Sequence, residues 1–283
     1  MVDNGLIKYY RSFRRGKRLL DANNKSGFSY TEDRQGKRLV YLHSSEGSFY
    51  RKVLEKPERD AEILLSQLYA KAGLKSAIYL PIGENGEYTY VISNDIESEN
   101  VVMARDQDAK IKKDLGDSVY LVADTPFYLP EDSSRVNVDY FKYITKEGMK
   151  NLQLKRLVDV GAYNTDGHDE NYFYTLENGL ITDVISIDFA MSGRYRENFD
   201  LLSYYNEFVK NELRRDAMMR HFKENESLHY FVTPDEMAET IGAVDVVNVA
   251  KDIKSTIGYK ISHKYTDEIA SSFEDMAEQL IQP

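Results

Sequence analysis

The feature that most constrains the fold is a change of pattern along the chain, from short strands near the N-terminus to helices further on. Strands are predicted at Phe28–Glu32, Arg38–His43 and Ser48–Leu54, where Tyr, Val and Phe fill the strand positions. A turn that contains glycine separates each strand from the next. These residues are therefore expected to form an antiparallel meander.

A helix and two more strands are predicted after this meander. Pro57 suits the first turn of the helix, and Gly73 suits the position just past its end. The strands Ile78–Ile82 and Tyr88–Ser93 follow. The helix has an apolar stripe with helical spacing, formed by Ala61, Leu64, Leu65, Leu68 and Ala72. This region is expected to be a small antiparallel sheet that carries one helix.

The rest of the chain is predicted to be mainly helical. The polar residues 94–118 are interpreted as a connector or hinge with an excursion. Helices are predicted at Thr145–Val158 and Phe199–Leu213, and the strand pair Tyr172–Leu176 and Val184–Ile187 lies between them. We therefore expect a two-lobed α+β fold.

The boundary between the two lobes is placed after residue 95. Residues 1–95 form the small sheet lobe, and residues 96–283 form the larger, mainly helical lobe. In the second lobe, Thr233 and Glu236 form a capping box that begins a helix. The last helix is expected to bury Ile269, Phe273, Met276 and Leu280.

Charge and composition narrow the class of protein. The net charge of −10 argues against a nucleic-acid-binding protein, because binding a polyanion needs a basic surface. The chain has no cysteine, which excludes disulfides and cysteine–zinc sites. No apolar run approaches the roughly 20 residues that span a bilayer, and no apolar signal core is found at the N-terminus. A cytoplasmic protein is expected, with a secreted effector as the alternative.

Basic residues gather near the N-terminus, and two interpretations remain open. The cluster can dock an acidic partner or a membrane surface, or it can be a solvated helix face that pairs with the acidic body of this protein. The second interpretation is favoured. The cluster consists of Arg11, Arg14, Arg15, Lys17 and Arg18.

The residues that carry chemistry lie in a polar loop, NTDGHDEN from Asn164 to Asn171, and at the end of the strand pair that follows. Phosphoryl transfer needs a carboxylate beside the attacking hydroxyl, and it needs an amide oxygen and a second carboxylate to hold Mg²⁺. Asp166 fits the first role, while Asn171 and Asp188 offer the hard oxygen ligands that Mg²⁺ prefers. The alternative is that these residues only cap turns and end a strand.

This loop resembles the catalytic loop of the HipA-like kinases and of the related phosphatidylinositol-kinase-like families, whose pattern is approximately N-x-D-x-H-x-x-N. The run IDFAMSG from Ile187 is similar to the metal-binding Asp-Phe-Gly element of protein kinases, with Ala190 in place of the glycine. The run through Asp200 and Leu201 also resembles the choline-kinase and aminoglycoside-kinase pattern. The resemblance implies a protein-kinase-like fold that uses ATP and Mg²⁺.

The resemblance also implies nucleotide-binding residues in residues 1–95. Lys52, on the third strand, is the candidate for binding the α- and β-phosphates, and Lys37 is the alternative. Glu62, on the helix, is the expected ion-pair partner of Lys52, with Glu58, one turn earlier, as the alternative.

Two further assignments complete the candidate site. No G-x-G-x-x-G motif is found, so Gly47, or alternatively Gly36, is the candidate for covering the nucleotide. His168 belongs to the catalytic loop, where the resemblance implies a structural or phosphate-facing role. No Ser-His-Asp arrangement can be built from the local sequence.

Three classes of function are compatible with these residues. The first is a HipA-like protein serine/threonine kinase that transfers the γ-phosphate of ATP to a hydroxyl. The second is a kinase of a small molecule or lipid headgroup, and the third is a nucleotide-binding pseudokinase or interaction module. Intact Asp166, Asn171 and Asp188 argue against the third class.

Overall fold

The computed structural model describes residues 29–33, 39–44, 47–82, 89–96, 98–115, 142–164, 166–193, 232 and 234–281. Several predictions concern residues outside these ranges. They are the helix at 199–213, the basic N-terminal cluster, the capping box of Thr233, and the assignments of Gly36, Lys37 and Asp200, while the side chain of Leu280 is also outside the description.

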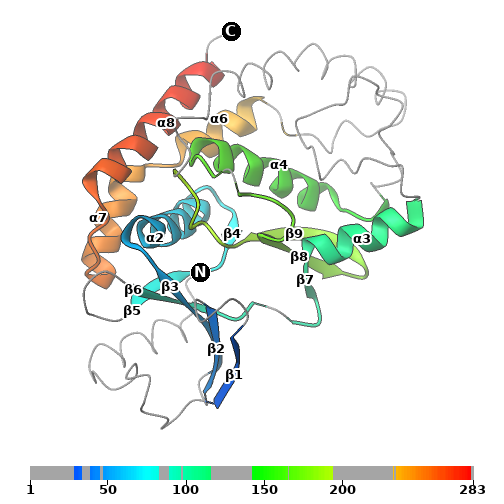
Figure 1. Ribbon diagram of the computed structural model, residues 1–283. Coiled ribbons are helices and arrows are strands. Elements are labelled where there is room, and N and C mark those ends of the chain that lie inside the picture. Colours follow the sequence, from blue (N-terminus) through cyan, green and yellow to red (C-terminus); the bar gives the residue numbers. More distant parts are fainter. Residues whose placement is uncertain are drawn as a thin grey trace.

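A five-stranded sheet forms the N-terminal part of the molecule (Figure 1). Its order is β1-β2-β3-β6-β5, and all its strands pair antiparallel. The predicted meander and the following two strands are thus confirmed, with ends within one or two residues of those expected. The strands are β1 (Ser29–Asp33), β2 (Leu39–Ser44), β3 (Gly47–Leu54), β5 (Tyr79–Ile82) and β6 (Thr89–Asn94).

Helix α2 (Lys56–Lys71) lies between this sheet and the C-terminal helices (Figure 1). It begins with a capping box, in which the amide of Glu55 donates to Glu58 Oε2 at 2.7 Å. The predicted stripe of Ala61, Leu64, Leu65 and Leu68 is fully buried, and Gly73 follows the helix with a positive φ of 77°. The helix therefore packs on both sides, which fixes its position.

A second, four-stranded sheet has the order β4-β9-β8-β7. The hairpin β8 (Tyr172–Glu177) and β9 (Leu180–Ser186) is the predicted strand pair, with β9 beginning earlier than expected. The short strand β4 (Lys75–Ser76), directly after α2, pairs parallel with β9. This pairing brings the end of β9 close to α2 and the first sheet.

Residues 94–118, interpreted as a connector or hinge with an excursion, contain two regular elements that the sequence did not predict. The structure has strand β7 (Val101–Met103) and helix α3 (Ala104–Leu115) there. β7 pairs antiparallel with β8 and forms an edge of the second sheet. The helix presents only a narrow apolar side, with Ala104 and Ile111 buried, which explains why its sequence appears polar.

The described C-terminal part is helical, as predicted. It contains α4 (Lys146–Gly161), α6 (Pro234–Gly242), α7 (Val246–Ile257) and α8 (His263–Ile281). The side chains of Met149, Leu152 and Leu157 in α4 are buried, as are Ile269, Phe273 and Met276 in α8. None of the helices in the described ranges is long and apolar enough to cross a membrane.

One hydrophobic core joins the two parts of the molecule. It contains side chains from β3, α2, α4, α7 and α8, so α2 shares its core with the C-terminal helices. A second core lies between α3, α4 and the β8–β9 hairpin. The predicted boundary after residue 95 stays a prediction. Strand β4, at residues 75–76, lies before this boundary in the sequence but belongs to the second sheet.

Candidate active site

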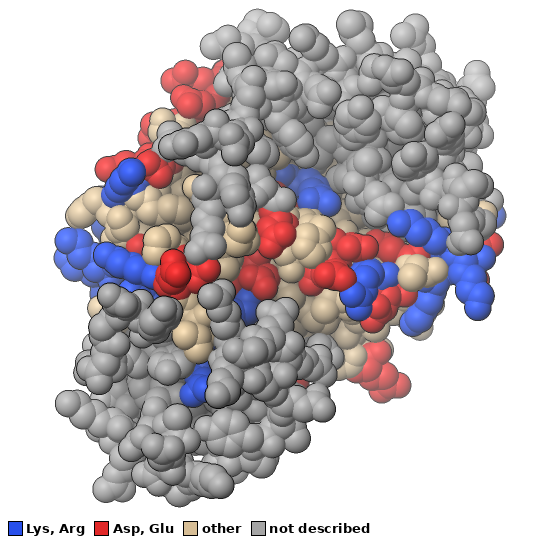
Figure 2. Space-filling view, in the orientation of Figure 1, with Lys and Arg blue, Asp and Glu red and all other residues tan. Residues whose placement is uncertain are grey.

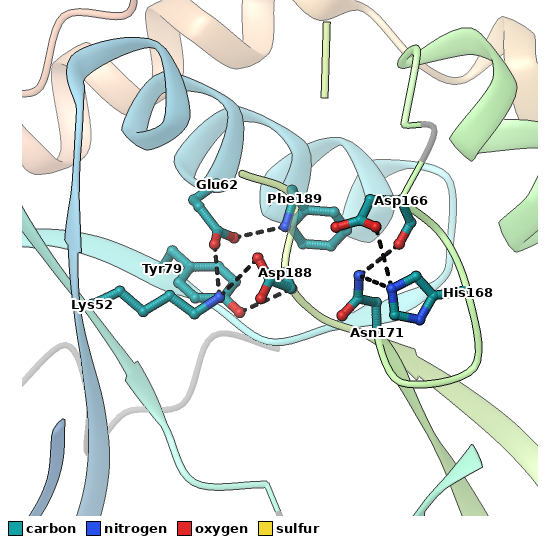
Figure 3. Close-up of polar contacts among 8 residues, drawn as sticks. All are labelled: Lys52, Glu62, Tyr79, Asp166, His168, Asn171, Asp188 and Phe189. Carbon is teal, nitrogen blue, oxygen red and sulfur yellow. Dashed lines mark hydrogen bonds and ion pairs between the residues drawn. The ribbon is translucent and has the colours of Figure 1, made fainter. Parts of the chain in front are cut away.

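Lys52 lies at the centre of the candidate site, where β3, α2 and the segment after β9 meet (Figure 3). Its ammonium is 2.8 Å from Glu62 Oε1 and 3.1 Å from Asp188 Oδ1. Lys52 pairs with Leu39 on one neighbouring strand and Val91 on the other, so its backbone is held in the middle of the sheet. The ammonium is therefore held in place by both the strand and its two carboxylate partners.

Glu62 is completely buried and uses both of its carboxylate oxygens. Oε1 binds Lys52, and Oε2 accepts the backbone amide of Phe189 at 3.0 Å. Glu58, the alternative ion-pair partner, instead caps the start of α2. Of the two glutamates, Glu62 is thus the one that contacts Lys52.

Asp188 follows β9 in a left-handed backbone conformation, with a φ of 55°. A non-glycine residue adopts this conformation at a cost of about 1–3 kcal/mol, which the surrounding contacts must offset. The amide of Asp188 donates to the hydroxyl of Tyr79 at 3.2 Å, and Phe189 is fully buried against the rings of Tyr69 and Tyr79. The Asp188 side chain keeps 38% exposure and so remains open to a ligand.

The three ionisable groups of this cluster influence one another. Burial raises the pKa of Glu62 to about 7, against the lowering effect of Lys52. Burial alone would lower the pKa of Lys52, but Glu62 and its other neighbours hold that pKa well above its usual value. Burial would likewise raise the pKa of Asp188, yet Lys52 and the Ala190 amide lower it. Lys52 and Asp188 therefore stay charged at neutral pH.

The residues of the loop Asn164–Asn171 form a second group beside this cluster. His168 Nε2 lies 3.2 Å from Asp166 Oδ1, and the Asn171 side-chain amide donates to the backbone carbonyl of Asp166 at 2.6 Å. His168 Nδ1 accepts the amide of Glu170 at 3.2 Å. Asp166 and His168 keep 36% and 50% side-chain exposure. The loop thus presents an open carboxylate whose position is fixed by local hydrogen bonds.

The β8–β9 hairpin brings the two groups together. Tyr172 pairs with Ser186, and one residue further out the amide of Ile187 donates to the carbonyl of Asn171 at 2.9 Å. Asn171 therefore lies next to the segment that carries Asp188. The side chain of Asn171 lies between Asp188 and His168, with its oxygen on the side of Asp188 (Figure 3).

The donor set agrees with a Mg²⁺ site that a nucleotide would complete. Within the described ranges, no group of three or more His, Cys, Asp or Glu side chains could hold a metal on its own. Asn171 and Asp188 offer one amide oxygen and one carboxylate, and Mg²⁺ in nucleotide sites typically takes few protein ligands together with phosphate oxygens. These two residues fit that pattern.

Gly47 lies apart from the cluster. It begins β3, five residues before Lys52, which is about 16 Å along an extended strand. It pairs with Ser44 at the end of the β2–β3 hairpin. The assignment of Gly47 to the nucleotide cover stays a prediction.

Sequence reasoning missed Tyr79 as a member of the site. Its hydroxyl accepts the amide of Asp188, and Lys52 Nζ lies 5.1 Å from the centre of its ring. A tyrosine in a strand is usually a core residue, so the local sequence has no signal for this role. The contact arises because the chain after α2 is tied to β9, where the amide of Ala77 donates to the carbonyl of Ser186 at 2.9 Å.

Comparisons with known proteins return matches to structures only. No family model and no curated protein matches the sequence. A Helicobacter pylori proinflammatory kinase, CtkA, is 11% identical with a TM-score of 0.48, over 90% of this chain and 96% of its own. HipA of Shewanella oneidensis, solved with HipB and operator DNA, is 11% identical with a TM-score of 0.46, over 97% of this chain and 70% of its own.

An aminoglycoside phosphotransferase, APH(4)-Ia, solved with ADP and hygromycin B, is also similar. It is 12% identical with a TM-score of 0.26, over 89% of this chain and 95% of its own. HipA and aminoglycoside kinases are among the families that the motifs of this chain resemble.

Proposed function

We propose that this protein is a Mg²⁺-dependent kinase that transfers the γ-phosphoryl group of ATP to a hydroxyl group. The observation that carries the proposal is the contact of Lys52 with both Glu62 and Asp188, at 2.8 and 3.1 Å, beside the Asp166–Asn171 loop. An ammonium has three N–H donors, so one remains for a phosphate oxygen when the other two serve the carboxylates. A lysine held in this way is suited to bind the phosphates of a nucleotide.

Each side chain has a distinct role in the proposed reaction. Lys52 binds the α- and β-phosphates, and Glu62 holds Lys52 in position. Asn171 and Asp188 would hold Mg²⁺, which supplies charge neutralisation at the phosphates when bound. His168 orients Asp166 through the contact at 3.2 Å.

Asp166 accepts the proton of the attacking hydroxyl. The hydroxyl oxygen forms a bond to the γ-phosphorus while the bond between that phosphorus and the β-phosphate oxygen breaks. ADP and a phosphorylated acceptor are the products. Because Asp166 is open to solvent and stands beside Asn171, an acceptor hydroxyl can approach it from outside.

For the acceptor, we favour a serine or threonine of a protein. The side chains of Asp166, His168 and Glu170 have 36%, 50% and 49% exposure. An open surface of this kind suits a large acceptor, whereas a small molecule would be expected to bind in a closed pocket. Figure 2 shows charged side chains of both signs across the middle of one face of the molecule. A small molecule or lipid headgroup is the second candidate, favoured by the run from Ile187 to Leu201 that resembles the choline and aminoglycoside kinases.

The experiment that tests the proposal is transfer of label from γ-labelled ATP in the presence of Mg²⁺. The wild-type protein should yield labelled protein, labelled acceptor or free phosphate, and Asp188→Asn should reduce this to background. Asp183→Asn is the matched control, since Asp183 lies on the same hairpin but binds Lys75, at 2.7 Å. Wild-type turnover in Asp188→Asn would overturn the metal assignment.

Asp166→Asn separates binding from chemistry. The variant should lose about 10²- to 10⁴-fold in rate, because the proton acceptor acts in the transition state. Its affinity for ATP with Mg²⁺, measured by calorimetry, should stay close to that of the wild type. A weakened affinity with an unchanged rate would contradict the assignment.

A further inference from the structure

A buried charged cluster next to the site has no role in the proposed reaction. At its centre is Asp159, in the last turn of α4, with 3% exposure. One carboxylate oxygen of Asp159 accepts the hydroxyl of Tyr69 and, at 2.7 Å, the side-chain amide of Asn164. The other accepts the ammonium of Lys155 at 2.6 Å. The guanidinium of Arg156 lies 3.9 Å from this second oxygen. Side chains from α2, from α4 and from the loop after α4 thus meet at a single carboxylate.

The same carboxylate contacts the catalytic loop on both sides of Asp166. Before it, Asn164 donates its side-chain amide and also its backbone amide, the latter to the Asp159 carbonyl at 2.8 Å. After it, the backbone at Gly167 passes so close that an added Cβ would lie 2.7 Å from Asp159 Oδ2. The path of the loop around Asp166 is therefore set by the position of Asp159.

The hydroxyl of Tyr69 links this carboxylate to the Lys52–Glu62 pair. Tyr69 lies on α2, seven residues after Glu62, which is two helical turns and the same face of the helix. Its ring packs on Phe189, with ring centres 5.0 Å apart, and the amide of Phe189 binds Glu62. Tyr69 thus contacts both the segment after Asp188 and the carboxylate that anchors the loop.

We propose that Asp159 is a positioning residue, which through Tyr69 holds the loop of Asp166 and Asn171 at a fixed place relative to Glu62, Lys52 and Asp188. This inference rests on the proposed function, because it assigns a task in the same site. A buried ion pair is often no more stabilising than apolar side chains of similar volume. The pair of Asp159 with Lys155 is therefore explained better by the geometry it imposes than by its contribution to stability.

A purely structural role predicts a different set of contacts. An ion pair between Lys155 and Asp159, four residues apart on α4, could serve the helix alone. It would require neither the hydroxyl of Tyr69, 90 residues away in sequence, nor the amide of Asn164. The two roles are therefore distinguished by removing the Tyr69 hydroxyl while leaving the ion pair intact.

The test uses Tyr69→Phe rather than a substitution of Asp159, because Asp159→Ala would leave the buried Lys155 ammonium without its carboxylate and could unfold the chain. Phenylalanine keeps the ring on Phe189 and removes only the hydroxyl. Ser66→Ala is the matched control. Ser66 is fully buried on the same helix, and its hydroxyl donates to the carbonyl of Ile63 at 3.0 Å, away from Asp159.

Two measurements are made on the full chain of each variant, steady-state ATP turnover with Mg²⁺ and hydrogen exchange of the loop amides. Tyr69→Phe should lower kcat about tenfold, the equivalent of one hydrogen bond to a charged group, while KM for ATP changes less than about twofold. The amides of Glu170 and Asn171, which bind His168, should exchange faster than in the wild type. Ser66→Ala should change neither quantity.

The outcomes separate this inference from the proposed function. If the wild type turns over no ATP, the proposed function fails, and the exchange of the loop amides still decides whether the Tyr69 hydroxyl positions the loop. If Tyr69→Phe matches Ser66→Ala in both kcat and exchange, the inference is overturned. It is also overturned if kcat falls only in proportion to a lower melting temperature, with loop exchange unchanged.

Discussion

The carboxylate of Glu62 accepts the backbone amide of Phe189 at 3.0 Å, across 127 residues of sequence. Its other oxygen binds Lys52 at 2.8 Å. A single buried side chain on α2 therefore sets the position of the ammonium on β3 and of the backbone that follows Asp188. Any displacement of α2 must disturb both, which makes the position of this helix decisive for the site.

Glu62→Gln tests the burial of this carboxyl group through stability. Burial raises the pKa of Glu62 from 4.5 to about 7, so between these pH values the unfolded chain has lost a proton that the folded chain still binds. Wild-type stability should therefore fall by about 3 kcal/mol relative to Glu62→Gln as the pH rises from 4.5 to 7, and stay level above that.

Urea unfolding at several pH values measures this difference. Glutamine does not titrate but keeps an acceptor for the Phe189 amide, so the comparison isolates the proton. Unfolding free energies that run parallel for the two proteins across this pH range would refute the raised pKa.

Lys52→Met tests the proposed phosphate contact. In the proposed reaction this ammonium binds the nucleotide phosphates, so its loss should raise KM for ATP and lower kcat/KM by about a hundredfold. Lys75→Met is the control, since Lys75 on β4 is exposed and pairs with Asp183 at 2.7 Å. Equal kinetics for Lys52→Met and Lys75→Met would move the assignment to Lys37.

The N-terminal strands and α2 could be predicted from the sequence because their signals are local. Turn glycines, alternation and an apolar stripe give the ends of these elements to within one or two residues. Strands β4 and β7, with two and three residues, are too short to show any period. β4 exists because residues 75–76 pair with residues 185–186, which no local pattern predicts.

The candidate site, too, could be predicted from the sequence only in part. The spacing of the loop and hairpin, together with the family resemblance, indicated Asp166, Asn171 and Asp188. It favoured Glu62 as the partner of Lys52 but left Glu58, one turn earlier on the same helix, as the alternative. The choice depends on which of them contacts Lys52, and the other is used by the capping box.

The contact between Tyr69 and Asp159 was also not predicted from the sequence. A tyrosine on a buried helix face and an aspartate in a last helical turn are common residues at such places. Their contact joins α2 to α4 across 90 residues, and only the tertiary structure shows it.

Gly167→Ala tests how tightly the catalytic loop packs on α4. A Cβ at this position would lie 2.7 Å from Asp159 Oδ2 and 3.0 Å from a guanidinium nitrogen of Arg156, so the loop must shift. We expect at least a tenfold loss of kcat, because displacements of about 1 Å can reduce rates strongly. Gly242→Ala, where a Cβ meets nothing within 4 Å, is the control and should retain wild-type kcat. Normal turnover in Gly167→Ala would show that the loop tolerates this shift.

The contact between α2 and the α7–α8 connection provides the last prediction. The hydroxyl of Tyr259 donates to Asp60 Oδ1 at 2.5 Å, and the amide of Ser262 donates to Asp60 Oδ2 at 3.0 Å. Asp60 is 1% exposed, so these donors take the place of water around its carboxylate. Tyr259→Phe removes one of them and should lower the free energy of unfolding by about 2 kcal/mol, measured by urea denaturation.

Ser272→Ala is the control for this loss, because it also removes a hydroxyl from a buried position. In the described part of the chain, the Ser272 hydroxyl has no hydrogen-bond partner, so its removal should leave stability unchanged or slightly raised. Asp60→Asn combined with Tyr259→Phe should cost less than the sum of the two single changes, since both weaken the same contact. Additive losses would mean that the Tyr259 hydroxyl stabilises the fold as the acceptor of Arg59 Nε, at 2.5 Å, and not through Asp60.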